Sequence, residues 1–330
     1  MAKRIITFLL LSLSLNLFAA QKINGAGATF PYPLYSKWFS EYAKAHAGIE
    51  FNYQSIGSGG GIKQVLAQTV DFGATDAPMT DDELKQAKTP IHHVPTVLGA
   101  VTVTYNVKGI ATGLNLDGET IGKIFLGTIT KWNDPAIVKL NPKTKLPATD
   151  ILVVRRSDGS GTTFVYTTFL AATSAEFKAK VGAGKNVTWP VGVGAKGNEG
   201  VTALVSQTDG AIGYVELAYA NQNKLSVASV KNLKGEFVKP SVDAISKAAA
   251  NVKDATGDLR ISVINSDAKG AYPISSFTWL LLPENAASPA LKEVRNFLQW
   301  AMKDGQKMAA SLDYAPLPKK LAEAITKKFK

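Results

Sequence analysis

Short runs of β-type apolar residues alternate along the chain with amphipathic segments of helical period. The β-type runs predict strands over residues 50–56, 71–75, 211–215 and 277–282. The amphipathic segments predict helices over residues 32–46, 62–68, 81–87, 121–125, 134–140, 163–172, 199–207, 216–223, 289–303 and 317–328. The helix at residue 289 has the clearest start, because Ser288 suits the N-cap and Pro289 the first helical position. Alternation of this kind is typical of a layered α/β fold.

Two longer apolar runs, residues 96–106 and 274–282, are candidates for strands that pass from one domain to another. The chain is long enough for two domains even without its first 20 residues. Two crossings would build one domain from both ends of the chain and a second from its middle. Periodicity alone leaves this arrangement open.

The first 20 residues have the pattern of a secretory signal peptide. Lys3 and Arg4 precede an apolar run over residues 5–17, and Ala19 and Ala20 supply the small residues of a cleavage site. The apolar run is short for a transmembrane helix, so we expect cleavage after Ala19 or Ala20; an uncleaved anchor is the alternative. The sequence contains no cysteine, which excludes a lipoprotein attachment site, disulfides and thiolate metal sites.

The chain carries a formal net charge of +11, or +9 once Lys3 and Arg4 are removed. A basic surplus often indicates nucleic-acid binding. Here the basic residues are scattered, without a Lys/Arg stripe interleaved with aromatics, which favours an ordinary solvated surface. A weaker functional interpretation is that the surplus attracts anions over a long range.

Three glycine-rich turns before predicted helices are candidate anion sites. They span residues 25–31, 55–61 and 155–163, and the third follows a buried apolar run. The first turn of a helix offers unpaired N–H groups and a partial positive charge. In the third turn, Arg156, Ser160, Gly161 and Thr162 add donors suited to a tetrahedral oxyanion, with Asp158 beside them. The alternatives are a plain turn, a flexible connector and a capped helix with Arg156 in a surface salt bridge.

Familiar phosphate and nucleophile motifs do not fit these turns. Phe30 occupies the third glycine position of a dinucleotide fingerprint, and none of the turns has the lysine of a nucleotide-hydrolase phosphate loop. Neither Gly-Ser-Gly segment forms a Gly-x-Ser-x-Gly nucleophile elbow.

Asp76 follows the predicted strand at residues 71–75 and precedes Ala77 and Pro78. It is either an ordinary turn aspartate or an acceptor inside an anion site. A carboxylate repels an anion unless the anion carries a proton, as phosphate does at neutral pH and sulfate does not. As an acceptor inside an anion site, Asp76 would discriminate against sulfate.

These segments closely resemble the periplasmic phosphate-binding proteins of phosphate ABC transporters. The resemblance is carried, in order, by residues 25–31, 57–61, 71–78, 126–135, 155–162, 211–216 and 312–318. It implies a type II periplasmic binding protein fold, in which two α/β domains joined by two crossover strands close on a ligand in the cleft between them. The implied lobes are residues 21–103 plus 274–330 and residues 104–273.

The resemblance also implies a role for each site residue. Phosphate would be bound by Thr29, Phe30 (through its N–H), Ser58, Asp76, Arg156, Ser160, Gly161 and Thr162, with Asp158 holding Arg156. Gly59 stands where some relatives have serine. The implied protein is a monomeric periplasmic receptor that binds inorganic phosphate with high affinity and delivers it to inner-membrane permease subunits of an ABC importer. It would need no metal or other cofactor, would bind no nucleic acid and would not be an enzyme.

Rival functions are a receptor for another oxyanion such as sulfate, a secreted phosphatase-like enzyme and a nucleic-acid binder. The sequence offers His46, His92 and His93 as its histidines. Adjacent His92 and His93 would point apart, and no carboxylate lies at ligand spacing, which disfavours a metal site. No base is suggested near Ser160, so we expect no catalytic residues.

Overall fold

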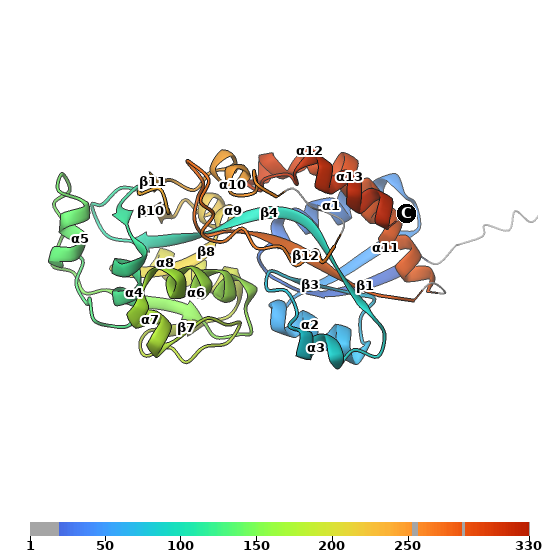
Figure 1. The fold of residues 1–330 in the computed structure, drawn as a ribbon, viewed down its shortest axis with the longest axis horizontal. Coiled ribbons are helices and arrows are strands. Elements are labelled where there is room, and N and C mark those ends of the chain that lie inside the picture. Colours follow the sequence, from blue (N-terminus) through green and yellow to red (C-terminus); the bar gives the residue numbers. More distant parts are fainter. Residues whose placement is uncertain (1–19, 253–256, 286–287, 330) are drawn as a thin grey trace, which may run out of the picture.

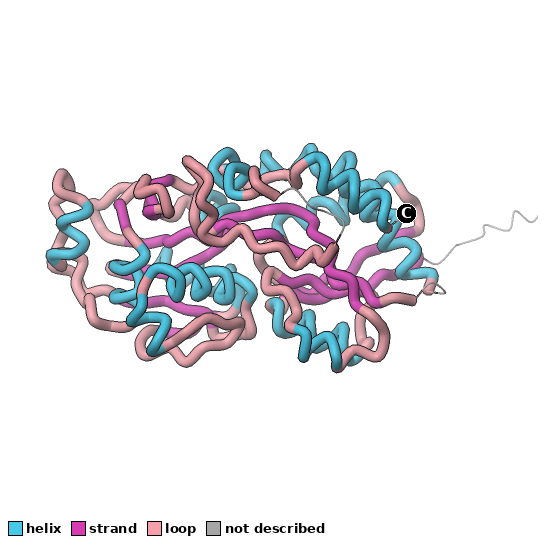
Figure 2. Tube along the Cα trace, viewed as in Figure 1, coloured by secondary structure: helices cyan, strands magenta, loops and turns pink. Residues whose placement is uncertain are grey.

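A computed structural model of the chain describes residues 20–252, 257–285 and 288–329, and residues 1–19 of the predicted signal peptide lie outside this range. Strands and helices form two lobes side by side, joined through a waist along which strands run from one lobe into the other (Figures 1 and 2). The predicted α/β fold is confirmed. In the part of the chain that the structure describes, no helix combines the length and apolar character needed to cross a membrane.

One curled sheet extends through both lobes. Its strand order is β2-β1-β3-β12-β4-β8-β6-β7, and β9 also pairs with β4. The strands are β1 (Gln21–Gly27), β2 (Ile49–Ser55), β3 (Phe72–Thr75), β4 (Ile91–Asn106), β6 (Leu152–Arg156), β7 (Val193–Ala195), β8 (Ala211–Glu216), β9 (Ser226–Val227) and β12 (Ser275–Pro283). A small second sheet joins β5 (Asn115–Leu116), β10 (Ser229–Lys231) and β11 (Phe237–Val238).

Strand β4 links the two lobes. Its residues up to Ala100 pair antiparallel with β12, whereas Val101 and the residues after it pair with β8. The apolar pattern predicted this strand only from residue 96, because two histidines and Pro95 interrupt the run. Pro95 is opposite Trp279, where the register shifts, and proline is tolerated at such irregularities. The residues at which one lobe ends and the other begins stay a prediction.

The helices cover both faces of the sheet in each lobe (Figure 2). They are α1 (Tyr32–Ala45), α2 (Ser58–Ala67), α3 (Asp81–Lys85), α4 (Gly118–Phe125), α5 (Pro135–Leu140), α6 (Gly161–Thr173), α7 (Ala175–Lys180), α8 (Gly197–Gln207), α9 (Leu217–Gln222), α10 (Val242–Ala248), α11 (Pro289–Trp300), α12 (Gln306–Ala309) and α13 (Lys319–Lys328). Ser288 caps α11, since its hydroxyl accepts from the N–H of Leu291, as predicted. The pattern missed α7, α10 and α12.

Four helices begin earlier than the pattern predicted: α4 begins at Gly118 rather than at residue 121, and the other three early starts lie where the lobes meet. Helix α2 begins at Ser58 rather than at residue 62, α6 at Gly161 rather than at residue 163, and α8 at Gly197 rather than at residue 199. Apolar periodicity cannot detect such turns, because they are built of glycine and hydroxyl residues. Gly57 is the N-cap of α2, and Ser58 is its first helical residue.

Strand β1 was also missed, because its last residues, Gly25-Ala26-Gly27, read as a turn. The strand lies between β2 and β3 and is parallel to both. A Cβ on Gly27 would lie 2.1 Å from the carbonyl oxygen of Ala74, and one on Gly61 would lie 2.6 Å from Cα of Gly27. The glycines therefore let α2 pack directly on the ends of β1 and β3, which brings three chain segments together at one point.

Candidate functional site

All nine predicted site residues lie where the two lobes meet. Thr29 and Phe30 follow β1, Ser58 opens α2, and Asp76 follows β3. From the other lobe, Arg156 ends β6, Asp158 and Ser160 lie in the following turn, and Gly161 and Thr162 open α6. Every one of these residues is buried except Asp158, whose side chain is 11% exposed. The structure thus gathers segments more than 120 residues apart into one polar cluster inside the protein.

Contacts across the lobe boundary show how close the two halves of this cluster are. A Cβ on Gly161 would lie 2.4 Å from Oγ of Ser58 and 2.5 Å from Oδ2 of Asp76. The N–H of Gly59 donates to the carbonyl of Gly159 at 2.8 Å. At the rim, Nζ of Lys185 lies 2.6 Å from Oε1 of Glu83. The lobes are therefore in contact around the site.

The N-terminal ends of helices give the candidate site much of its preference for a negative charge. Helices α2, α6 and α8 all begin at the cluster, and the first N–H groups of a helix have no acceptor inside the helix. The hydroxyl of Ser160 caps α6 by accepting from the N–H of Thr163 at 3.0 Å, which leaves its hydrogen to donate elsewhere. Three positive helix ends and their N–H groups make this a site that favours an anion.

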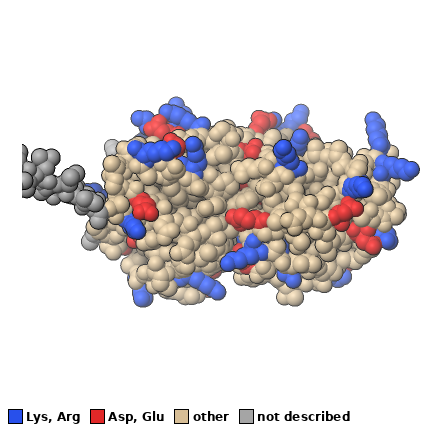
Figure 3. Space-filling model, turned by 180° about the vertical axis from the view of Figure 1, so that it is seen from behind, with Lys and Arg blue, Asp and Glu red and all other residues tan. Residues whose placement is uncertain are grey.

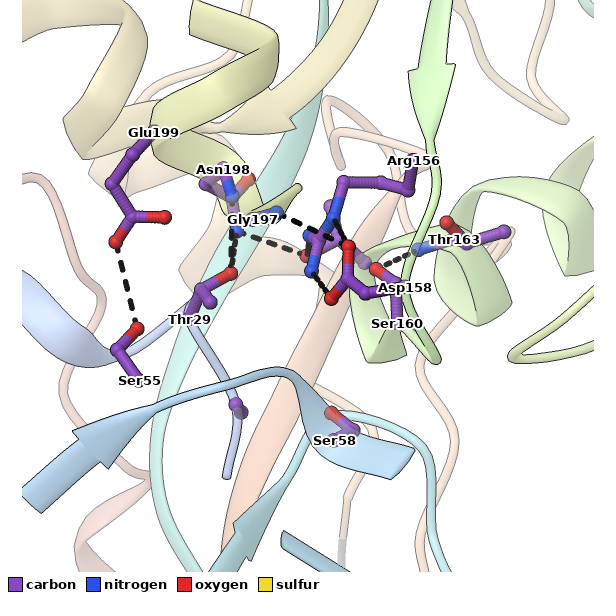
Figure 4. A network of polar contacts seen from close by, with 12 residues as sticks. Thr29, Ser55, Ser58, Arg156, Asp158, Ser160, Thr163, Gly197, Asn198 and Glu199 are labelled. Carbon is purple, nitrogen blue, oxygen red and sulfur yellow. Dashed lines mark hydrogen bonds and ion pairs between the residues drawn. The ribbon is translucent and has the colours of Figure 1, made fainter. Parts of the chain in front are cut away.

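Arg156 is held rigidly by Asp158 (Figure 4). Nε donates to Oδ1 at 2.7 Å and Nη2 donates to Oδ2 at 2.5 Å, while Nη1 donates to the hydroxyl of Thr162 at 3.3 Å. The N–H of Gly197 also donates to Oδ1 of Asp158, at 3.1 Å. Burial acts to raise the pKa of Asp158, but its hydrogen bonds to Arg156 and the charge of that group outweigh it and lower the pKa. Asp158 is therefore a charged partner for Arg156.

Asp76 behaves differently from Asp158. Burial raises its pKa to about 7, against the opposing effects of the hydrogen bond from Thr278, the charge of Arg156 and the hydrogen bond from Ser58. Thr278 on β12 donates to Oδ1 of Asp76 at 2.8 Å, and the hydroxyl of Ser58 donates to Oδ2 at 3.3 Å. The carboxyl group is thus fixed in place and close to balance between its neutral and charged forms at neutral pH.

Phe30 is anchored through both its ring and its carbonyl group. Its side chain is fully buried, and its ring packs edge-on against that of Tyr314 with centroids 6.4 Å apart. The hydroxyl of Tyr314 donates to the carbonyl of Phe30 at 2.6 Å. These contacts anchor the turn between β1 and α1, where Thr29 and Phe30 lie.

Sequence reasoning missed two side chains that complete the cluster. Asn198, in the first turn of α8, donates from Nδ2 to the hydroxyls of Thr29 and Thr162, and Thr278 donates to Asp76. Asn198 lies in Gly197-Asn198-Glu199-Gly200, a fourth glycine-containing helix start, so the criterion that found the other three turns could have found it. The sequence offers no comparable signal for Thr278, a polar residue within an apolar strand.

His92 and His93 each have a partner other than Ser160. Nε2 of His93 accepts from the N–H of Met79 at 2.9 Å, and burial lowers the pKa of His93 to about 4. Nε2 of His92 lies 3.7 Å from Oε2 of Glu284. Among the residues that the structure describes, no group of three or more His, Cys, Asp or Glu is placed to hold a metal ion.

Basic and acidic side chains are interspersed on the face of the molecule drawn in Figure 3, with no continuous basic stripe on that face. Many basic side chains are also paired along single helices, as Lys37 is with Glu41 and Lys180 with Glu176. This face therefore offers no continuous basic track for a nucleic-acid backbone.

A two-lobed α/β protein with a buried anion-type site between its lobes belongs to the class of periplasmic binding proteins, and comparison with known proteins agrees. Residues 18–304 match the model of a family described as PBP superfamily domain. The chain is 46% identical over 329 residues to the phosphate-binding protein PstS of Pasteurella multocida, which covers 98% of this chain and 95% of that protein. It is 44% identical over 314 residues to that of Haemophilus influenzae, covering 94% and 93%. The chain therefore belongs to the PstS family of phosphate-binding proteins.

Solved structures share the fold. A high-affinity periplasmic phosphate-binding protein solved with phosphate bound superposes with a TM-score of 0.74 at 23% identity, and 93% of each chain is covered. A phosphate-binding protein from Stenotrophomonas maltophilia gives a TM-score of 0.68 at 20% identity, with 93% of this chain and 94% of that chain covered. The predicted family and the two-lobed fold are confirmed.

Proposed function

We propose that this protein binds inorganic phosphate between its two lobes and delivers it to a phosphate ABC importer. The observation that carries the proposal is the pairing of a dense set of anion donors with one buried carboxyl group, Asp76, held in place by hydrogen bonds from Thr278 and Ser58. A site built only of donors would suit any oxyanion. A carboxyl group among them suits an anion that brings its own proton.

Each predicted residue has a role in this proposal. Arg156 pairs with phosphate oxygens, and Asp158 keeps its guanidinium in register. Hydroxyls of Thr29, Ser160 and Thr162 donate, as do backbone N–H groups of Phe30 and Gly161. Ser58 donates to phosphate by turning its hydroxyl hydrogen away from Asp76. Asp76 accepts the phosphate proton, steadied by Thr278.

The balance of charge agrees with phosphate as the ligand. The bound pair of Arg156 and Asp158 is neutral as a unit, so helix ends, hydroxyls and N–H groups carry much of the stabilisation. Such groups can solvate a buried dianion fully without a metal, provided that nearly all its lone pairs are satisfied. Sulfate lacks the proton at neutral pH, so a charged Asp76 would face it with a repelling lone pair.

The same proposal covers the protein's setting. It acts in the periplasm after removal of a signal peptide, as a monomer that hands one ion to permease subunits in the inner membrane, and it catalyses no reaction. Its lobes comprise residues 21–103 with 274–330 and residues 104–273. Membership of a substrate-binding transport family supports the absence of catalysis.

Equilibrium dialysis of the mature protein with radiolabelled phosphate tests this function. We expect one phosphate bound per chain, displaced by unlabelled phosphate and by arsenate, but not by excess sulfate or by phosphate esters. Displacement by sulfate as readily as by phosphate would assign the site to oxyanions in general. Absence of phosphate binding by the folded protein would refute the proposal, and release of phosphate from an ester would refute its non-enzymatic part.

A further inference from the structure

We propose that Asn198 is a positioning residue that turns the hydroxyls of Thr29 and Thr162, one from each lobe, into fixed donors to the bound anion. The inference rests on the proposed function and adds to it a residue that does not itself contact the ligand. It follows from the hydrogen bonds around the Asn198 side chain, and Figure 4 shows Asn198 next to Thr29.

The orientation of the Asn198 amide is fixed by the backbone. The N–H of Glu216 donates to Oδ1 of Asn198 at 2.9 Å, and a backbone N–H can only donate. The oxygen of the amide must therefore face Glu216, and Nδ2 must face the site. Asn198 is fully buried, so water cannot replace these partners.

Both hydrogens of Nδ2 are then used on the two threonines. Nδ2 donates to Oγ1 of Thr29 at 2.7 Å and to Oγ1 of Thr162 at 3.1 Å. Thr29 belongs to the turn after β1 and Thr162 to helix α6 in the other lobe. One amide group thus bridges the two lobes through two hydroxyls.

Each hydroxyl oxygen receives a second donor. The N–H of Asn198 donates to Oγ1 of Thr29 at 3.2 Å, and Nη1 of Arg156 donates to Oγ1 of Thr162 at 3.3 Å. A hydroxyl oxygen has two lone pairs and one hydrogen, so both lone pairs are occupied in each case. The single hydrogen of each threonine is left to donate, and the anion is its acceptor.

This arrangement reduces the cost of binding. A free hydroxyl can rotate and can present either a lone pair or a hydrogen to the ligand, so binding would have to restrict it. Here the hydroxyls are oriented before the anion arrives, and they cannot present a lone pair to it without losing a bond to Asn198 or Arg156. The bridge also links ligand binding to lobe closure, because Thr29 meets Asn198 only when the lobes are in contact.

The variants Asn198→Asp and Asn198→Ala test the inference by calorimetric titration with inorganic phosphate. Aspartate keeps the shape and the bond from Glu216 but replaces the two donated hydrogens by an acceptor, which draws the threonine hydrogens away from the anion. We expect the Kd to rise about tenfold or more for alanine and further for aspartate. A Kd within twofold of wild type for both folded variants would overturn the inference.

Asn141 supplies the matched control. It is also buried, and its side chain makes three hydrogen bonds, accepting from the N–H of Asn115 and donating to the carbonyls of Asn115 and Ile137. Asn141→Asp and Asn141→Ala should lower the melting temperature and leave the Kd for phosphate unchanged. An equal rise of the Kd in the Asn141 variants would mean that general destabilisation, not positioning, explains the effect.

A double-mutant cycle distinguishes positioning of the hydroxyls by Asn198 from a merely structural role. If Asn198 acts through hydroxyls, the factor by which Asn198→Ala raises the Kd must shrink in a Thr29→Val background, whereas Thr29→Ser should retain it. The same factor in both backgrounds would overturn the inference. Failure of the wild-type protein to bind phosphate would refute the proposed function instead, so the two failures are distinguishable.

Discussion

Gly161 faces Asp76 across the lobe boundary so closely that a single methyl group at Gly161 would lie 2.5 Å from the carboxylate oxygen Oδ2. The same methyl group would lie 2.4 Å from the hydroxyl of Ser58. The first residue of α6 is therefore a glycine because the opposite lobe occupies the space that a side chain would need. The close approach of Gly161 to Asp76 and Ser58 therefore requires that the lobes are closed.

Gly161→Ala should consequently weaken phosphate binding without unfolding the protein. Alanine is a better helix former than glycine, so the lobe that carries α6 should not lose stability, whereas closure would cost the energy of a tight overlap. We expect the Kd to rise about tenfold to a hundredfold, with an unchanged or slightly higher melting temperature. Gly200→Ala in α8 is the control, because its methyl group would make only an ordinary 3.4 Å contact with Ala195. Equal Kd values for the two variants would contradict the account.

Asp76→Asn should relax the discrimination between phosphate and sulfate. The amide keeps the shape of the side chain but removes the negative charge that repels an unprotonated oxyanion, and a polar group built for one hydrogen bond can discriminate by about 10⁴ to 10⁵. Titration calorimetry with both anions should show weaker phosphate binding and measurable sulfate binding. Unchanged selectivity would remove Asp76 from this role.

The raised pKa of Asp76 also predicts how stability depends on pH. Because burial raises the pKa from 3.8 to about 7, the folded state holds a proton that the unfolded state releases between these values. The contribution of Asp76 to stability is therefore full below pH 4 and is lost as the pH rises through 7, by about 1.4 kcal/mol for each unit of the pKa shift. Ligand-free Asp76→Asn should lack this loss. In denaturant titrations, the free energy of unfolding of the variant should therefore rise relative to that of wild type between pH 4 and 8. Parallel stability curves would argue against a raised pKa.

Arg156→Ala should nearly abolish binding, and Arg156→Lys should recover only part of it. Alanine removes the cation and leaves Asp158 as an unpaired carboxylate in the site, whereas lysine restores the charge but not the planar pair of bonds to Oδ1 and Oδ2. We expect the Kd to rise about thirtyfold or more for alanine, with lysine in between. Wild-type affinity of the alanine variant in equilibrium dialysis would exclude Arg156 as a ligand.

The ion pair between Glu83 and Lys185 should slow release of the ligand. It joins the lobes at the rim, with side chains 25% and 16% exposed, so its contribution is modest and depends on salt. Glu83→Gln removes the charge but keeps a group that can accept from the N–H of Thr80 in the capping box of α3. Stopped-flow measurements should show dissociation about twofold to fivefold faster at low salt, with the difference lost at high salt.

Asp82→Asn is the matched control, since Asp82 pairs with Lys85 within the same helix and on the surface. Its release rate should equal that of wild type at every ionic strength. A Glu83→Gln variant that releases phosphate at the wild-type rate would mean that this pair does not help to hold the lobes closed.

Most of the fold could be predicted from apolar periodicity, and the errors nearest the site have a common cause. The early starts of α2, α6 and α8 and the last residues of β1, Gly25-Ala26-Gly27, are built mainly from small and polar residues, which carry little hydrophobic signal. These are also the segments that come together between the lobes. A pattern method is least informative where small and polar residues are needed for close backbone approach.

The residues of the candidate site also differ in how far the sequence could predict them. Arg156 and Asp158 are two residues apart, and Ser160 and Gly161 sit at a helix start, so local sequence suffices to group them. Asn198 lies at a helix start that the same criterion could have found, but its contact with Thr29, 169 residues away, could not be predicted from local sequence. Thr278 could not be assigned to the site, because its partner Asp76 lies 202 residues away in the chain.

The sequence by itself determined the α/β layering, the glycine-rich helix starts and the family, because each depends on residues that are neighbours in the chain. Only the tertiary structure decided which of these starts face one another. It also decided that Asp76 is buried with a raised pKa while Asp158 is held charged by Arg156. The physical reason is that desolvation and pairing depend on what surrounds a group in space. For Asp76 those surroundings come from α2, β12 and the opposite lobe.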